Sequence, residues 1–339
     1  KLGIVQQPRV IEGDQLEQMS RSQMLEVVQD TQVVFARIAP EQKLTIVEAF
    51  KELGEVVAVT GDGVNDAPAL KRADIGIAMG QRGTDVAKEA SDIILLDDNF
   101  ATIVTAVEEG RAVYDNIKKF ITYILTSNIP EILPFIAYVL LPIPLPITVV
   151  QILAIDLITD ILPAIGLGNE PPESDVMQRP PRQRNERLVS YRTFIRSYGI
   201  IGPAEAALSF LAFFLVLTAG DWHWAEPLAS TSVLYGQASG AFLATIIFCQ
   251  IGNVMACRTN RQSAVPYLLR HNMWIWAGSL VEVLFIMSII YLPLFHTFFS
   301  TAALPLWVWG IILAAPWIIF AIEEVRKWLV RRGVHWLMA

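Results

Sequence analysis

Glycines and carboxylates alternate in residues 59 to 70, directly after an apolar, strand-like run. Gly61 and Gly63 allow backbone N–H groups to approach an anion closely, and Asp62 and Asp66 supply the hard oxygen ligands that suit Mg²⁺. A bare Asp-Gly pair is more often an acidic turn between a strand and a helix. The complete stretch is more specific, and it favours phosphate and magnesium chemistry.

A second group of polar residues lies inside two long apolar runs further along the chain. Asn128 and Glu131 share a helix face in the first run, and Asp156, Thr159 and Asp160 share one in the second. Ionisable groups at membrane depth are costly and are usually functional. Oxygen ligands disfavour Cu⁺ and Zn²⁺ and suit Na⁺, K⁺, Ca²⁺ or protons. The structural alternative is hydrogen bonding between helices.

Later apolar runs carry four more polar residues. Glu282 is a further candidate for cation binding, whereas packing fits Gln250 and Asn253 as well as ligation does. Glu205 is also expected to be functional, and the alternative is that, following Pro203 near the cytoplasmic end of its run, it reaches the membrane interface.

The first hundred residues predict short strands that alternate with helices, which indicates a parallel sheet. The expected strands are residues 33 to 36, 56 to 59, 75 to 78 and 93 to 95. Ligands of such sheets bind at the carboxyl ends of the strands, and Asp62 lies at one of these ends.

From residue 98 or 99 the pattern becomes helical and continues to the end of the first apolar run. A helix from there to residue 141 would be roughly 60 Å long, more than a bilayer requires. We therefore expect its first half, with Arg111, Lys118 and Lys119, to stand in water as a stalk that enters lipid near Phe120.

Composition agrees with a membrane protein, because hydrophobic residues make up 53% of the chain and charged residues 17%. The net charge of -7 disfavours nucleic acid as a partner. Hydropathy predicts six spans, at about 120 to 141, 147 to 167, 198 to 219, 233 to 256, 273 to 293 and 304 to 322. Arginines and lysines cluster in alternate connections and in the tail, so the positive-inside rule places these and the first hundred residues in the cytoplasm.

Two soluble stretches, residues 35 to 43 and 59 to 70, resemble motifs of the P-type ATPases. These cation pumps pass through an aspartyl-phosphate on a haloacid-dehalogenase-like domain. The resemblance implies that Asp62 holds Mg²⁺. It also implies that the phosphoryl group is bound by Lys43, Thr60 and Gly61. Asn65 and Asp66 would complete the hydrogen-bonded base of the site.

The membrane motifs at residues 127 to 132 and 155 to 160 are most similar to the sodium-potassium and proton-potassium pump group, with calcium pumps next. The resemblance implies that the oxygen ligands of the first two runs bind transported ions. Calcium pumps usually have Asn where Asp156 stands. Gln250, Asn253 and Glu282 match positions near an additional sodium site, but an Asp normally stands where Asn253 does, so this chain lacks one charge there.

The family's Asp-Lys-Thr-Gly-Thr segment, whose aspartate is the nucleophile, does not occur in this sequence. We also expect the nucleotide-binding domain, which binds most of ATP, and four membrane helices to be missing. Without the attacking carboxylate this chain alone should not hydrolyse ATP by the family route. It is therefore interpreted as the C-terminal portion of a pump.

The predicted fold class is a partial α/β haloacid-dehalogenase-like parallel sheet followed by an all-α bundle of six transmembrane helices. Its parts are the C-terminal part of the phosphorylation domain (1–98), a stalk helix (99–119), a cation-transport domain (120–325) and a cytoplasmic tail (326–339).

The predicted function is Mg²⁺-dependent, ATP-driven cation transport across the plasma membrane. The expected partners are the transported cations, the lipid bilayer, the N-terminal part of the same pump and an accessory subunit. Two alternatives stay open: a passive transporter that retains a phosphatase-like domain, and a non-catalytic membrane subunit that binds ions.

Overall fold

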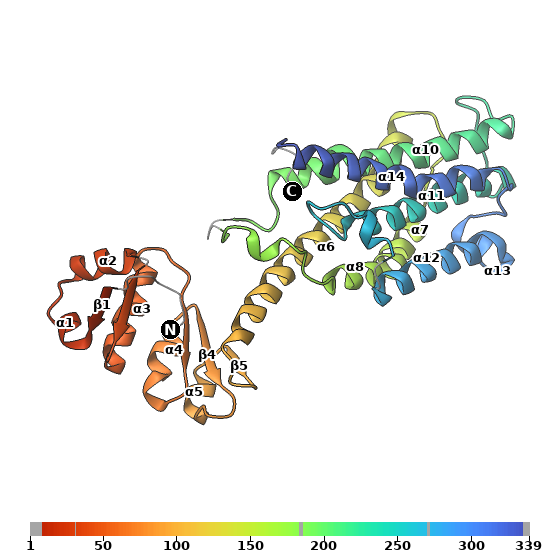
Figure 1. Cartoon of the computed structure of the whole chain (residues 1–339). Coiled ribbons are helices and arrows are strands. Elements are labelled where there is room, and N and C mark those ends of the chain that lie inside the picture. Colours follow the sequence, from red (N-terminus) through yellow and green to blue (C-terminus); the bar gives the residue numbers. More distant parts are fainter. Residues whose placement is uncertain (1–8, 31, 183–185, 270–271, 335–339) are drawn as a thin grey trace. The chain divides into compact units, whose positions relative to one another are not determined.

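The computed structural model describes residues 9–30, 32–182, 186–269 and 272–334. The chain divides into two compact units between Val107 and Glu108. We call them the α/β unit and the helical unit and describe each by itself (Figure 1).

The α/β unit confirms the predicted alternation of strands and helices and their parallel pairing. Among the described residues the strands form two ladders, β1-β2 and β3-β4-β5, rather than one. In chain order the elements are β1 (Arg9–Glu12), α1 (Gly13–Glu17), α2 (Arg21–Gln29), β2 (Val33–Ala36), α3 (Pro40–Glu52), β3 (Ala58–Gly61), η1 (Val64–Asp66), α4 (Ala67–Arg72), β4 (Ile75–Met79), α5 (Asp85–Glu89) and β5 (Ile93–Leu95).

The structure contains one strand that was not predicted, and another strand begins at a later residue than predicted. Strand β1 was not expected, because only Ile11 of its four residues is buried and no apolar alternation marks it. Strand β3 begins two residues later than predicted. The reason is that the Val57 N–H donates to the side chain of Asp74 (2.9 Å) instead of to a neighbouring strand.

The helical unit confirms the prediction of six membrane-spanning segments. Within the described residues, six helical stretches are long and apolar enough to cross a bilayer. They are α6 (Ala101–Leu140), α7 with η2 and α8 (Val149–Gly168), α9 with η4 and α10 (Tyr191–Ala219), α11 (Val233–Cys257), α12 (Met273–Tyr291) and α14 (Val308–Arg331). The protein is therefore a multi-pass membrane protein.

Helix α11 forms the centre of the helical unit, between α10, α14 and α12 (Figure 1). Nearly all of its residues are buried. A Cβ atom added to Gly252 would lie 2.3 Å from the carbonyl oxygen of Pro316, so α11 and α14 pack backbone against backbone. Such close packing fixes the helices that carry the intramembrane polar groups.

The predicted water-exposed stalk is wrong for part of its length. Lys119 is only 1% exposed, and Arg111 donates hydrogen bonds to the carbonyl oxygens of Val176 (3.0 Å) and Arg179 (2.9 Å). The connection after α8 folds back against α6, buries Lys119 and binds Arg111, which stays partly exposed. Sequence periodicity cannot reveal this, because the covering segment is distant in the chain.

The predicted cytoplasmic tail also begins inside a helix. Helix α14 continues to Arg331, and Arg326 and Lys327 within it are buried. The last part of the predicted tail, residues 335–339, lies outside the described residues.

Candidate functional site

The glycine-rich loop after β3 brings the predicted phosphate-binding residues together. Lys43, in the first turns of α3, donates from Nζ to the carbonyl oxygen of Thr60 (2.8 Å) and to Oδ1 of Asp66 (2.8 Å). The other carboxylate oxygen of Asp66 accepts from the backbone N–H groups of Asp62 (3.2 Å) and Gly63 (3.1 Å). Asp66 therefore joins the lysine to the loop.

The two glycines of this loop have different roles. A Cβ atom at Gly61 would lie 2.5 Å from Cβ of Asp66, so only glycine lets the loop close over that side chain. A Cβ atom at Gly63 would come no nearer than 3.6 Å, and Gly63 has an ordinary φ of -102°. Packing against Asp66 therefore requires glycine at position 61 but not at position 63, while the approach of both backbone N–H groups to an anion stays a prediction.

The charged carboxylate of Asp66 stabilises the loop through its hydrogen bonds. Burial raises the pKa of this carboxyl, but the hydrogen bond from Lys43 and those from the backbone outweigh burial and hold the pKa below its ordinary value. Asp66 is therefore ionised at neutral pH. Asp62 and Asn65, in contrast, are exposed. The Asp62 carboxylate, a hard oxygen donor at the carboxyl end of a parallel strand, fits Mg²⁺.

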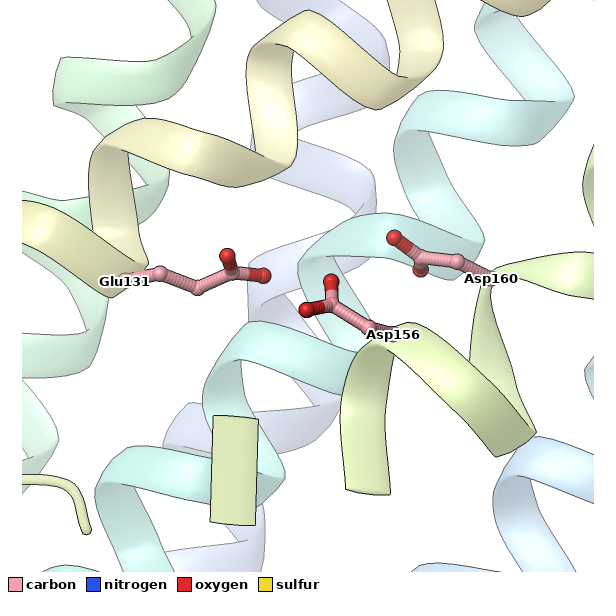
Figure 2. A group of neighbouring side chains, drawn as sticks. All are labelled: Glu131, Asp156 and Asp160. Atoms are coloured by element: carbon pink, nitrogen blue, oxygen red, sulfur yellow. The ribbon is translucent and has the colours of Figure 1, made fainter. Parts of the chain in front are cut away.

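Three carboxylates converge in the helical unit (Figure 2). One oxygen each from Glu131, Asp156 and Asp160 lies within 4.8 Å of the others. Glu131 and Asp160 are each 6% exposed, whereas Asp156 is exposed and leaves the cluster open on one side. Three acids at this spacing repel one another unless protons or a cation offset their charge, so the arrangement fits a hard cation.

A π-helical segment places two of these acids. Residues Ile155–Thr159 form η2, in which Asp160 N–H donates to the Ile155 carbonyl (3.1 Å), one residue further back than in an α-helix. Such wide turns often occur at functional sites. Asp160 also accepts from the Tyr123 hydroxyl (3.1 Å), while Oε1 of Glu131 is buried and has no partner within the described part of the chain.

The other two predicted ligands of the first two spans, Asn128 and Thr159, form hydrogen bonds with groups other than the three acids. Asn128 donates to the Tyr198 hydroxyl (3.2 Å), and the buried Thr159 donates to the Ile155 carbonyl (2.8 Å). Neither is engaged with the three acids in the described structure, so their role as ligands stays a prediction.

The four polar residues singled out in the later spans are all buried. Gln250 donates to the Ser127 hydroxyl (3.2 Å), and Asn253 accepts from the thiol of Cys257 (3.4 Å). Both carboxylate oxygens of Glu282 and of Glu205 lack a partner within the described residues. Glu205 is 0% exposed, so the alternative in which it reaches the membrane interface is wrong.

A group of buried ion pairs was not foreseen from the sequence. The sequence suggested only an orientation signal for the arginines between residues 168 and 197, yet within the described residues Arg179 and Arg196 bind acids in the helical unit. Three buried glutamates anchor the network: Glu170 to Arg258 (2.9 Å), Glu173 to Lys119 (3.4 Å) and Arg179 (3.2 Å), and Glu323 to Arg196 and Arg326. We call it the ion-pair network. The only signal in the sequence was acids and bases at helix ends, which is common on any surface.

The fold and these two sites define a class of protein: a multi-pass membrane protein with an α/β phosphate-loop domain and an oxygen-lined intramembrane cluster. Residues 144–329 match the family described as cation transporting ATPase, C-terminus, and residues 44–107 match haloacid dehalogenase-like hydrolase. The first match covers more than half of the chain, so the chain belongs to the cation-transporting ATPase family. The family resemblance and fold class predicted from the motifs are confirmed.

Curated relatives agree with this assignment. The chain is 41% identical to the sodium/potassium-transporting ATPase subunit alpha-4 of Rattus norvegicus and 43% identical to subunit alpha-2 of Gallus gallus, in both cases over 95% of this chain. It is 41% identical to the alpha subunit of Drosophila melanogaster over 96% of this chain. The chain spans about a third of the length of these relatives (34% of each).

Proposed function

We propose that this chain forms the C-terminal part of an ATP-driven cation pump that works through an aspartyl-phosphate. The observation that carries the proposal is the convergence of Glu131, Asp156 and Asp160 within a member of the cation-transporting ATPase family. The phosphate loop supports it, because Lys43, Thr60 and Asp62 surround one anchor, Asp66.

In this pump the loop residues bind and orient a phosphoryl group. The Lys43 ammonium and the backbone of Thr60 and Gly61 would hold its oxygens, and Asn65 and Asp66 would support the loop beneath it. The Asp62 carboxylate would hold Mg²⁺, which offsets negative charge in phosphoryl transfer. The attacking aspartate and most of the ATP-binding surface would come from parts of the pump outside this sequence.

In the helical unit, the oxygen cluster would bind the transported cation. Because Asp156 is exposed, we propose that the N-terminal part of the pump closes the open side of the cluster. The ligand set would also include side chains whose roles come from the sequence pattern: Asn128, Thr159 and Glu282, with Gln250 and Asn253 as secondary ligands. Sodium and potassium are favoured by the Asp at 156, and Ca²⁺ also suits a carboxylate cage.

The ends of helix α6 suggest how the two activities are linked. The helix begins within the α/β unit and carries Glu131 in the helical unit. We propose that phosphorylation and dephosphorylation shift α6 and so change the cation affinity of the cluster. Loop charge would place the α/β unit in the cytoplasm of a cell whose plasma membrane holds the pump, with an accessory subunit as a further partner.

Substitution of the cluster tests this function. Asp156→Ala and Asp160→Ala in the full-length pump should each abolish the dependence of phosphoenzyme formation or breakdown on Na⁺, K⁺ or Ca²⁺. Glu226→Ala is the matched control, because this acid lies in an exposed connection. Unchanged ion dependence in both cluster variants would contradict the proposal. Cation flux without ATP in the wild-type protein would favour the passive-transporter alternative instead.

A further inference from the structure

Glu205 on helix α10 is a buried acid that the proposed cation cluster does not use. Its side chain is 0% exposed, and neither carboxylate oxygen has a hydrogen-bond partner within the described residues. An unpaired charge at such a position is among the costliest groups in a folded protein. Glu205 is also not a member of the group formed by Glu131, Asp156 and Asp160.

Contacts between α6 and the stretch that leads into α10 place Glu205 along the membrane segment. The Ser197 hydroxyl donates to the Thr122 carbonyl (3.3 Å), and a Cβ atom at Gly202 would lie 2.7 Å from Cβ of Ile129. Since both contacts occur in the same order along the chain, the two helices run in the same direction. Glu205, one turn beyond Gly202, therefore lies level with Glu131.

The charged groups near Glu205 are acids. Its charge interacts with those of Asp160 and Glu131, both acids, and it also interacts with Cys249 on α11. Gln250, the residue after Cys249, donates from its amide nitrogen to Ser127 on α6, while its amide oxygen is buried and has no partner within the described residues. Within the described residues, three helices thus present buried oxygens that lack donors: Glu131 Oε1 on α6, both oxygens of Glu205 on α10 and Gln250 Oε1 on α11.

We propose that Glu205 forms a further cation site, separate from the three-acid cluster and enclosed by α6, α10 and α11, which takes one monovalent metal cation. This inference rests on the proposed pump function. One carboxylate supplies a single negative charge, and the amide oxygen of Gln250, which is only a secondary ligand in the proposed function, supplies a neutral ligand to this site instead. That donor set matches Na⁺ or K⁺ and falls short of the several carboxylates that Ca²⁺ sites use.

The test compares Glu205→Gln with wild type in the full-length pump reconstituted in vesicles. The variant keeps the shape of the side chain and removes its charge. ATP-driven uptake of ²²Na⁺ and of ⁸⁶Rb⁺, the tracer for K⁺, is measured against phosphate released, in separate arms that identify the ion. Ser209→Ala is the matched control, because Ser209 is a buried polar residue on the same helix.

We expect Glu205→Gln to lose about one cation per phosphate in one of the two arms, with unchanged thermal stability and continued phosphorylation. The Ser209→Ala control should keep the wild-type ratio. A ratio in Glu205→Gln equal to wild type in both arms would overturn the inference and identify Glu205 as a permanently protonated acid. Failure of the wild-type protein to couple any cation uptake to ATP would instead overturn the proposed pump function.

Discussion

The helical unit buries acidic side chains in two regions, which differ in whether the acids have basic partners. In the ion-pair network Glu170, Glu173 and Glu323 each face at least one buried or nearly buried arginine or lysine. The second region holds Glu131 and Asp160, together with Glu205 and Glu282, and within the described residues none of these four acids forms an ion pair.

This difference separates two uses of a buried charge. An acid with a basic partner and saturated hydrogen bonds holds helices together and leaves nothing for a ligand to satisfy. An acid without a partner is stable only when a proton or a cation joins it, so it is suited to binding. The presence or absence of a basic partner, rather than burial itself, distinguishes the structural acids from the acids suited to binding.

The largest expected effect is in the ion-pair network. Glu323→Gln removes the acid that binds both Arg196 and Arg326 and leaves two buried cations without it. We expect a loss of about 3–5 kcal/mol in unfolding free energy, measured by denaturant titration in detergent micelles.

An exposed pair serves as the control for that prediction. Glu52→Gln breaks the ion pair with Arg21, whose side chains are 44% and 51% exposed, and should cost less than about 1 kcal/mol. If Glu323→Gln were as mild as this control, the network would not be a stabilising element.

For the second region, which holds Glu131, the expected result is the opposite: a small change in stability and a large change in cation binding. Glu131→Gln relieves repulsion with Asp156 and Asp160, so stability should change by less than about 1 kcal/mol. Cation affinity should fall by at least about tenfold, which is about 1.4 kcal/mol. The measurement is the cation concentration that half-saturates phosphoenzyme formation. A strongly destabilised variant with unchanged affinity would place Glu131 among the structural acids.

The Lys43–Asp66 pair in the α/β unit is an intermediate case, because both side chains are partly exposed (31% and 24%). Gly61→Ala should displace Asp66, since the new methyl carbon would overlap its Cβ. We expect a stability loss of about 1–3 kcal/mol and slower Mg²⁺-dependent dephosphorylation. Gly63→Ala, where space is available, should be close to wild type, and an equal loss in both variants would contradict the packing argument.

The smallest effect concerns the pH dependence of the same pair. The pKa of Asp66 is lowered in the folded protein, so its ionised form stabilises the fold above the ordinary carboxyl pKa. That contribution is lost as pH falls through the lower folded pKa. Lys43→Gln should move this loss to higher pH and lower the unfolding free energy by about 0.5 kcal/mol at neutral pH, within the range of about 0–1 kcal/mol that is usual for such pairs. The measurement is thermal unfolding between pH 3 and pH 7. Identical acid profiles for the two proteins would show that Lys43 does not set the pKa.

Local sequence patterns predicted much of this architecture. Strands β2 and β5 occur at the predicted residues, and the long apolar runs became membrane-length helices. Both features depend on the chemistry of neighbouring residues along the chain, namely β-branched runs and sustained hydrophobicity. The spacing of acids within one helix face likewise follows from helical geometry alone.

Contacts between distant segments were not predictable in the same way. The burial of Lys119, the pairing of Glu323 with Arg196 and the burial of Glu205 each depend on which segment of the chain lies opposite. A single sequence contains acids and bases that could satisfy many pairings, and the long-range packing energy selects among them.

The sequence by itself determined the family, the order of α/β and helical parts and the residue types available for cation and phosphate chemistry, because these follow from motifs and from hydrophobic patterning. Only the tertiary structure decided which acids are paired and which are not. The physical reason is that a buried carboxylate acquires its role from the groups that surround it in space, and those groups come from helices far apart in the chain.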